Sequence, residues 1–262
     1  MAPRAQMTRV SSRLTRLSGE AGAGVRLVCL PYAGAAATVY RNWGARLPPA
    51  VELLGADPPG RVTGQQGAVP SEGLLDVAAL IAGEIAALPR VPTVLFGHSL
   101  GALLAYETAV ELMLHGVPID HLVVSGCVAP HKGEKATPLH GLGQKEFFAA
   151  WNDSLRLPEI IRGSTEVQAL VYPMMKYDIW LYDTYEWDRH FELECPVTAF
   201  GGSSDRLSMG DSTRHWRDLT SGEFRLRLFP GDHFFLHSHE REVVGSVGAL
   251  LNVTGNAGGP RP

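Results

Sequence analysis

Short runs of apolar residues alternate with longer segments of helical periodicity along most of the chain. The runs are dense in Val, Leu and Phe, which is typical of parallel strands covered on both faces. We therefore predict strands over residues 26–31, 51–56, 93–97, 121–126, 196–201 and 224–229. Two intervening segments, 73–88 and 101–116, have the apolar spacing of helices. Strands that alternate with helices predict an α/β fold with a doubly wound, mostly parallel sheet.

Residues 131–194 interrupt this alternation, because they contain helical patterns and no strand signal. Helices are expected over 144–152 and 165–187. Ten of the 21 Phe, Trp and Tyr residues lie within 140–191. So much apolar bulk must be buried against another layer, and we expect this helical insertion to cover the carboxyl edge of the sheet as a lid. The pattern does not identify which of its residues contact a substrate.

Both ends of the chain lack this alternation. Residues 1–24 carry four arginines before the first acidic residue, Glu20, and no long apolar stretch, so we expect a disordered tail. Residues 252–262 are rich in Gly and Pro and are also expected to be disordered. Between the tails, residues 25–251 are expected to form one domain that includes the insertion 131–194.

Composition narrows the class of protein. Hydrophobic residues make up 45% and charged residues 19% of the chain, which excludes a mostly disordered protein. A net charge of −4 gives no support to nucleic-acid binding, which requires clustered cations. No apolar run reaches the length of about 20 residues that spans a bilayer, so no membrane partner is expected. Three widely spaced cysteines without a Cys-x-x-Cys pair disfavour a disulfide framework and suit the reducing cytoplasm.

Candidate chemistry is concentrated in the segment GHSLG at 97–101, between a predicted strand and a predicted helix. This Gly-x-Ser-x-Gly pattern at a strand-to-helix turn is typical of a nucleophile elbow, whose glycines avoid a steric clash. The turn raises the hydroxyl of Ser99 above the sheet at a helix N-terminus, where partial positive charge favours a developing anion. We predict Ser99 as the nucleophile and the backbone N–H of Leu100 as an oxyanion donor.

A serine hydroxyl needs a base, and after such an elbow the acid and then the histidine follow along the chain. His233 follows the last predicted strand, where its loop can meet Ser99, and we predict it as the base. The competing histidines are His215, His237 and His239.

The acid that orients the imidazole is expected after the preceding strand. Asp205 follows the run 196–201 and is our prediction, with Asp211 as its rival. Asp232 is adjacent to His233 and cannot easily turn toward its ring.

A second oxyanion donor is expected from the loop after the first core strand. This loop, LPYAGAAATVY at 30–40, is small and contains a glycine, so its backbone can approach a ligand closely. The N–H of Ala33 is our choice, and that of Gly34 is the near alternative.

Taken together, the motifs resemble those of the type II thioesterases associated with polyketide and nonribosomal peptide synthetases. The resemblance runs from about Val25 to Leu251. The segments that carry it are LPYAGAAATVYRNW (30–43), PPGR (58–61), GHSLGALLAYETA (97–109), YPMMKYDIWLYDTYEW (172–187), GGSSD (201–205) with a later Trp216, and LFPGDHFFL (228–236).

The resemblance implies an α/β-hydrolase core with a helical lid. It also implies a nucleophile, acid, base and two oxyanion amides at Ser99, Asp205, His233, Ala33 and Leu100, respectively. No catalytic group is missing, and the positions that differ from the family pattern bear on substrate preference rather than on chemistry. The second arginine that usually follows Pro-Gly-Arg in the family is absent from this chain. At four other positions this chain differs from the usual family residue: Tyr32 replaces His, Ala35 replaces Gly, Lys176 replaces Arg and Asp232 replaces Gly.

The function implied by the resemblance is hydrolysis of acyl thioesters on the phosphopantetheine arm of acyl or peptidyl carrier proteins, which removes stalled or aberrant acyl groups. No metal and no cofactor of the enzyme itself is expected. Two other interpretations remain open: a carboxylesterase or lipase acting on oxyesters, and a catalytically silent scaffold that binds carriers. Carrier proteins are commonly acidic, and the candidate docking cations are Lys132, Lys135, Lys145, Arg156 and Arg162.

Overall fold

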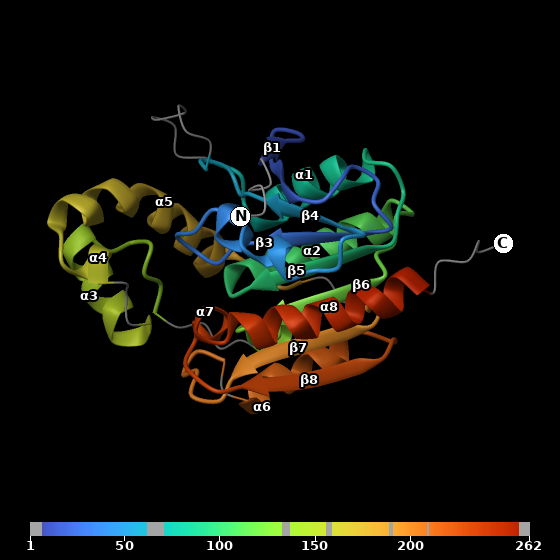
Figure 1. The fold of residues 1–262 in the computed structure, drawn as a ribbon. Coiled ribbons are helices and arrows are strands. Elements are labelled where there is room, and N and C mark those ends of the chain that lie inside the picture. The colour runs from blue at the N-terminus through green and yellow to red at the C-terminus, as the bar shows by residue number, and fades with distance from the viewer. Residues whose placement is uncertain are drawn as a thin grey trace.

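The computed structural model of the chain describes residues 7–61, 71–132, 137–155, 159–188, 191–208 and 210–256, without the side chains of 153–155, 210–211 and 253–256. These residues form a central sheet with helices on both faces and a group of helices beside it (Figure 1).

The sheet has eight strands in the order β1-β2-β4-β3-β5-β6-β7-β8. The strands are β1 Thr8–Arg9, β2 Leu14–Ser18, β3 Val25–Leu30, β4 Val51–Ala56, β5 Thr93–His98, β6 His121–Ser125, β7 Val197–Gly202 and β8 Phe224–Phe229. Strands β3 to β8 run parallel, whereas β2 pairs antiparallel with β1 and β4. The predicted doubly wound, mostly parallel sheet is therefore confirmed.

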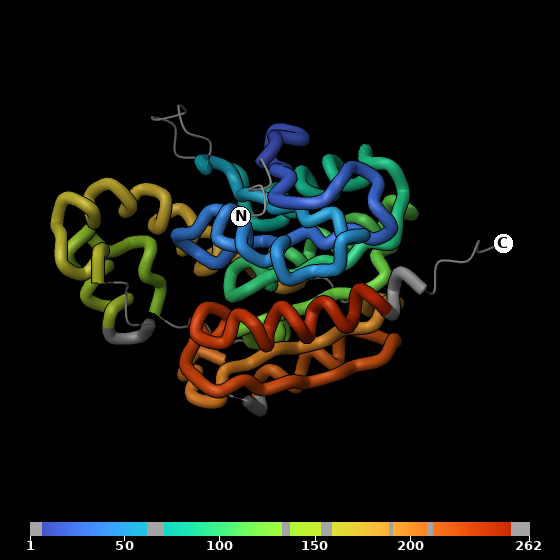
Figure 2. Tube along the Cα trace, viewed as in Figure 1, coloured from blue at the N-terminus to red at the C-terminus, as the bar shows by residue number. Residues whose placement is uncertain are grey.

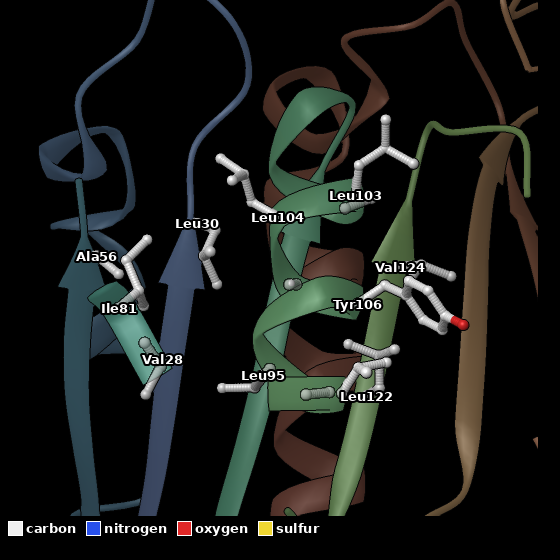
Figure 3. Packing of buried hydrophobic residues seen from close by; sticks show 14 of the residues in the cluster. Val28, Leu30, Ala56, Ile81, Leu95, Leu103, Leu104, Tyr106, Leu122 and Val124 are labelled. Atoms are coloured by element: carbon white, nitrogen blue, oxygen red, sulfur yellow. The ribbon is translucent and has the colours of Figure 1, made fainter. Parts of the chain in front are cut away.

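Alternate residues of the parallel strands face opposite sides of the sheet, and helices cover both sides. The covering helices are α1 Leu74–Ala86, α2 Leu100–Leu114 and α8 Glu240–Asn256. On one side, Val28 and Leu95 pack in a cluster with α1 and α2, as Figure 3 shows. On the other side, their neighbours Leu27 and Phe96 pack in a cluster with α8. Burial on both faces explains why the central strands have almost no polar alternation, whereas the edge strand β8 is mostly not buried and includes Arg225 and Arg227.

The described part of the N-terminal segment is not the disordered tail that we predicted for residues 1–24. It contains β1 and β2, and Leu14 and Leu17 of β2 are buried. Strand β2 adds to the edge of the sheet by antiparallel pairing with β4, which satisfies its backbone polar groups. The prediction failed because this edge strand has few apolar residues and depends on its partner strand.

The prediction of disorder for residues 252–262 is also wrong for residues 252–256, because α8 continues to Asn256. Buried residues such as Val247 and Leu251 hold the last turns of α8 near the sheet. Residues 257–262 lie outside the described residues.

Three helices lie between β6 and β7 in the chain, where we predicted a helical insertion. They are α3 Gln144–Leu155, α4 Glu159–Arg162 and α5 Thr165–Thr184. Figure 2 shows that α3, α4 and the first part of α5 project away from the sheet. They have a small apolar cluster of their own, formed by Phe147, Phe148, Trp151 and Met175.

Short helices occupy the remaining connections. They are α6 Gly210–Arg214, α7 Phe235–Ser238, and the 3-10 helices η1 Ala37–Tyr40, η2 Trp43–Ala45, η3 Pro130–Lys132 and η4 His215–Leu219. Across the described ranges, no helix combines the length and the apolarity needed to cross a membrane.

Candidate active site

The connections that follow β3 and β5 diverge at one point on the carboxyl edge of the sheet. The two strands are adjacent and parallel, but the chain leaves β3 toward β4 and leaves β5 toward β6 on the other side. In open α/β sheets, ligands bind at such a switch point because the diverging loops leave a crevice there. The loop at 31–36 and Ser99 lie at this point.

Ser99 lies on a strained turn between β5 and α2. Its φ angle is 56°, and no other non-glycine residue in the described ranges has a positive φ. A β-carbon on Gly97 would lie 1.9 Å from the Gly101 carbonyl oxygen, and one on Gly101 would lie 2.3 Å from the Leu30 carbonyl oxygen. The two glycines are therefore required by close backbone contacts. Backbone strain of this kind is concentrated at active sites, where the surrounding structure must maintain it.

The structure brings His233 and Asp205 together from the segments that follow β8 and β7. His233 Nδ1 lies 2.9 Å from Asp205 Oδ2, and both side chains are buried. Asp205 also accepts hydrogen bonds from the Ser208 hydroxyl and the Leu207 backbone N–H. Burial raises the pKa of Asp205, but the hydrogen bonds and the charge of His233 outweigh it, and the pKa falls below its usual value. An ionised Asp205 favours the imidazole tautomer with its proton on Nδ1, which leaves Nε2 to act as a base.

Ser99 and His233 line the same cavity, which has a volume of about 710 Å³. The helical insertion and the loop that precedes it provide another part of the lining, with Leu139, Trp151, Ile179 and Tyr182. Within the described residues, no hydrogen bond joins the Ser99 hydroxyl to the His233 imidazole. In enzymes without substrate such hydrogen bonds are often long, and they shorten when substrate binds.

Cys127 also lines this cavity. Burial, assisted by the negative charge of Asp205, raises the pKa of its thiol to about 12. The thiolate is the nucleophilic form of cysteine, so Cys127 is unreactive near neutral pH. Ser99 is therefore the better candidate for a nucleophile.

Ala33, in the loop after β3, lines the cavity together with Leu100. The alternative donor, Gly34, has its N–H bonded to Asp178 Oδ2 at 2.6 Å. The geometry therefore favours Ala33 over Gly34 as the residue that offers an amide to a ligand in the cavity.

The competing histidines have other contacts. His237 Nε2 lies 2.8 Å from the Tyr32 hydroxyl, which joins the histidine loop to the loop after β3. His239 contacts the hydroxyl of its neighbour in the chain, and His215 Nδ1 lies 3.4 Å from Asp218. None of these three histidines lines the cavity, whereas His233 does.

Asp205 is the aspartate that contacts His233. Asp232 instead uses Oδ1 to accept a hydrogen bond from the backbone N–H of Phe234, at 2.9 Å. The side chain of Asp211 lies outside the described residues.

Three buried side chains close to the cavity were not predicted to have a role. Arg61 and Asp178 form an ion pair beside the Ala33 loop, with exposed fractions of 1% and 0%. Arg61 belongs to the segment PPGR, whereas nothing in the sequence marks Asp178, which lies within a helical pattern.

The third of these side chains is His98. It bonds the Ser125 hydroxyl, at 2.9 Å, and burial together with the nearby His233 holds its pKa well below the usual value. A neutral His98 therefore packs beside His233 without adding charge.

His131, His215 and Asp218 form a cluster that the sequence did not indicate. Among the described residues, they are the group whose ligand atoms could hold a metal ion, since these atoms lie within 4.8 Å of one another. Both imidazoles contact Asp218 Oδ2 directly. The His131 Nδ1 is buried without a hydrogen-bond partner. In this arrangement the two imidazoles are hydrogen-bond partners of Asp218, and the contact with His131 lowers the pKa of that carboxyl group.

Comparisons with known proteins agree with this geometry. The family model described as a thioesterase domain matches residues 25–251. The gramicidin S biosynthesis protein GrsT of Aneurinibacillus migulanus is 31% identical over 240 residues, which cover 91% of this chain and 93% of that protein. Thioesterase PikA5 of Streptomyces venezuelae is 33% identical over 239 residues, which cover 89% of this chain and 83% of that protein. The solved structure of the type II thioesterase BorB from the borrelidin biosynthetic cluster superposes with a TM-score of 0.84, at 28% identity, and covers 93% of this chain and 99% of BorB.

The chain belongs to the thioesterase family, whose members are serine hydrolases of the α/β-hydrolase fold. The resemblance to type II thioesterases that the motifs indicated is thereby confirmed.

Proposed function

We propose that this thioesterase is an editing enzyme that releases stalled or aberrant acyl groups from the phosphopantetheine arm of acyl or peptidyl carrier proteins. The carriers belong to a polyketide or nonribosomal peptide synthetase. The observation that supports this most directly is the arrangement of Ser99, His233 and Asp205 at one cavity, in a chain of the thioesterase family.

In the proposed reaction, His233 Nε2 accepts the proton of Ser99 as Oγ attacks the thioester carbonyl carbon. The carbon–sulfur bond then breaks, the thiolate takes the proton from His233, and an acyl-serine remains. Water attacks this ester as His233 takes its proton; the carbon–Oγ bond then breaks, Ser99 Oγ takes the proton from His233, and the free acid is released. Asp205 stabilises the imidazolium at both stages, which is consistent with its burial and its lowered pKa.

The negative charge on the carbonyl oxygen is stabilised in this proposal by the backbone N–H groups of Ala33 and Leu100. Both residues line the cavity with Ser99, and Leu100 is the first residue of α2. The N-terminus of a helix carries partial positive charge, which favours an anion at this position. The reaction uses only groups of this chain and water.

Carrier docking is proposed to use cations beside the cavity. Of the predicted cations, Lys132 lines the cavity itself. Lys145 and Arg162 lie on a separate hollow of about 470 Å³ between α3 and α5, and Lys135 and Arg156 lie outside the described residues. We place the reaction in the cytoplasm, which fits a chain whose three cysteines are all free.

The decisive experiment combines a Ser99→Ala variant with a fluorophosphonate probe. Wild-type protein should be labelled at Ser99, as mapped by mass spectrometry, and Ser99→Ala should lose both the label and at least a thousandfold of thioester hydrolysis. A label on another residue, or unchanged turnover of Ser99→Ala, would overturn the assignment of the nucleophile.

Substrate class is tested with matched acyl chains presented as carrier-bound thioesters, as N-acetylcysteamine thioesters and as oxyesters. We expect the highest kcat/KM with the carrier-bound thioesters. A preference for oxyesters with no activity on acyl-carriers would show an esterase instead, and binding of carriers without any turnover would show a scaffold.

A further inference from the structure

A buried ion pair joins the helical insertion to the loop that is proposed to hold the oxyanion. Arg61 follows β4, and Asp178 lies in the second half of α5. Both side chains are almost fully buried, and neither lines the cavity. Arg61 and Asp178 can therefore affect the site only through the residues that they contact.

Both members of this pair bind the backbone of the loop at 31–36. Asp178 Oδ2 accepts the N–H of Gly34 at 2.6 Å and is also bonded by the Arg61 guanidinium. Arg61 Nε donates to the carbonyl oxygen of Ala35 at 3.1 Å. The pair thus holds the two residues that directly follow Ala33.

These contacts fix a tight turn that contains the Ala33 amide. The N–H of Ala35 donates to the carbonyl oxygen of Tyr32, and Gly34 has a φ of 81°. This hydrogen bond and this φ are those of a type II turn with glycine at its third position. The Tyr32 carbonyl and the Ala33 N–H belong to one planar peptide unit, so fixing the carbonyl also fixes the direction of the N–H.

The peptide between Ala33 and Gly34 distinguishes a type II turn from a type I turn, because its orientation is reversed between them. Asp178 accepts the N–H of that peptide and so favours the type II orientation. A β-carbon at Gly34 would lie 3.0 Å from Met175 Cγ, so α5 packs directly on this turn. An oxyanion site needs donors that are oriented before the reaction, which is what such contacts provide.

A purely structural ion pair would satisfy its buried atoms more completely. Asp178 Oδ1 is buried without a hydrogen-bond partner. Burial raises the pKa of Asp178, and the Arg61 charge opposes that effect. Burying a carboxylate with one unsatisfied oxygen lowers the stability of the fold. The contact of Asp178 with the turn therefore explains its position better than a gain in stability does.

From this geometry, we infer that Arg61 and Asp178 are positioning residues that orient the Ala33 amide toward the oxyanion and make this orientation depend on the packing of α5. The inference rests on the proposed function, because it assumes that the Ala33 amide binds the oxyanion.

The test uses Asp178→Asn and Arg61→Lys in the full-length protein with an N-acetylcysteamine acyl thioester. We expect Asp178→Asn to lower kcat about 10- to 100-fold with KM changed less than about threefold, since loss of one whole oxyanion donor costs about 100- to 1,000-fold. Arg61→Lys keeps the charge but cannot bridge two acceptors in the same way, so about a tenfold loss is expected. Binding of a trifluoromethyl ketone, which forms a tetrahedral adduct with serine, should weaken in parallel with kcat.

Glu52→Gln provides a matched control. Glu52 of β4 forms another buried ion pair with Arg26 of β3, with exposed fractions of 1% and 2%, and also bonds Arg16; Arg26 lies at the opposite end of β3 from the loop at 31–36. Glu52→Gln should lower the melting temperature and leave kcat unchanged. If Asp178→Asn behaves in the same way, the pair is structural only and the inference is wrong.

The double variant Arg61→Met with Asp178→Leu separates folding from positioning, because removing both charges leaves no unpaired ion. It should fold, and its kcat should stay low because Gly34 has lost its acceptor; a wild-type kcat in this folded protein would overturn the inference. Ser99 labelling is measured on every variant. Loss of kcat with Ser99 still labelled supports the positioning role, whereas absence of the label from wild-type protein would instead refute the proposed function.

Discussion

The two halves of α5 differ in what they contact. Met175, Tyr177, Asp178 and Leu181 are buried in the second half, where the helix packs against the core and the loop at 31–36. In the first half no residue is buried, and Leu170 is 74% exposed. One helix therefore belongs to two layers of the molecule, the rigid core at one end and the outlying insertion at the other.

The difference shows which half of α5 contacts the candidate site. The inner half of α5 packs on the proposed oxyanion loop and also lines the cavity with Ile179 and Tyr182, whereas residues of its outer half line the separate hollow of about 470 Å³ beside α3. Regions with few buried contacts open more easily than the core. We therefore expect substitutions in the inner half to affect global stability, turnover or the choice of substrate, and substitutions in the outer half to have little effect on these properties.

The largest expected effect comes from truncating one leucine in each half. Leu181 is 0% exposed, and Leu181→Ala should lower the free energy of unfolding by about 2–5 kcal/mol, as is usual for a buried leucine. Leu170→Ala removes an exposed side chain from the same helix and should change stability by less than about 0.5 kcal/mol. Urea denaturation followed by circular dichroism measures both. Equal losses would mean that the two halves of α5 unfold as one unit with the core.

The regular core was largely predictable, because the central strands β3 to β7 are buried on both faces and are rich in Val, Leu and Phe. The Ser99 turn was predictable as well, since close backbone contacts demand glycine at Gly97 and Gly101 and leave a local signature in the sequence. The strand β2 was not predicted, because its structure comes from pairing with β4 rather than from its own composition.

The ion pair beside the Ala33 loop could not be predicted for a related reason. Arg61 and Asp178 lie far apart in the chain, and although Arg61 belongs to the segment PPGR, nothing in the sequence connects it with Asp178. Only the packing of α5 brings the carboxylate to the Gly34 amide. Contacts of this kind have no spacing rule, so a single sequence does not reveal them.

A second prediction is that a histidine of the sheet, rather than a residue of the insertion, makes the free energy of unfolding fall at acid pH. His121 of β6 is buried and bonded to the Thr198 hydroxyl at 2.8 Å. Burial, and then the charge of Arg225, lower the pKa of His121 to about 4. An unfolded histidine gains its proton near pH 6.5, so the unfolded chain binds more protons than the native one below that pH. Stability should therefore fall between about pH 6.5 and pH 4, by up to about 3 kcal/mol.

The variant His121→Gln keeps a polar partner for Thr198 but cannot titrate, and its stability should depend less on pH over that range. His98, whose pKa is also lowered by burial, should account for part of the remaining slope. His115→Gln, at an exposed position on the surface, is the matched control and should leave the slope unchanged. If the slope of His121→Gln equals that of wild type, His121 is not the group that titrates.

The smallest expected effect concerns acyl-chain preference. Ile179 lines the cavity from α5 and packs with the small cluster of the insertion. Ile179→Phe should narrow the cavity and lower kcat/KM for the longest acyl thioesters about tenfold relative to the shortest, since one methylene in an apolar pocket changes discrimination by about 1–3 kcal/mol. A panel of thioesters from four to ten carbons measures this, with Leu170→Phe on the exposed part of the same helix as the control. A uniform loss across all chain lengths would mean that Ile179 affects the catalytic geometry rather than acyl-chain preference, and an equal change from Leu170→Phe would contradict the difference between the two halves of α5.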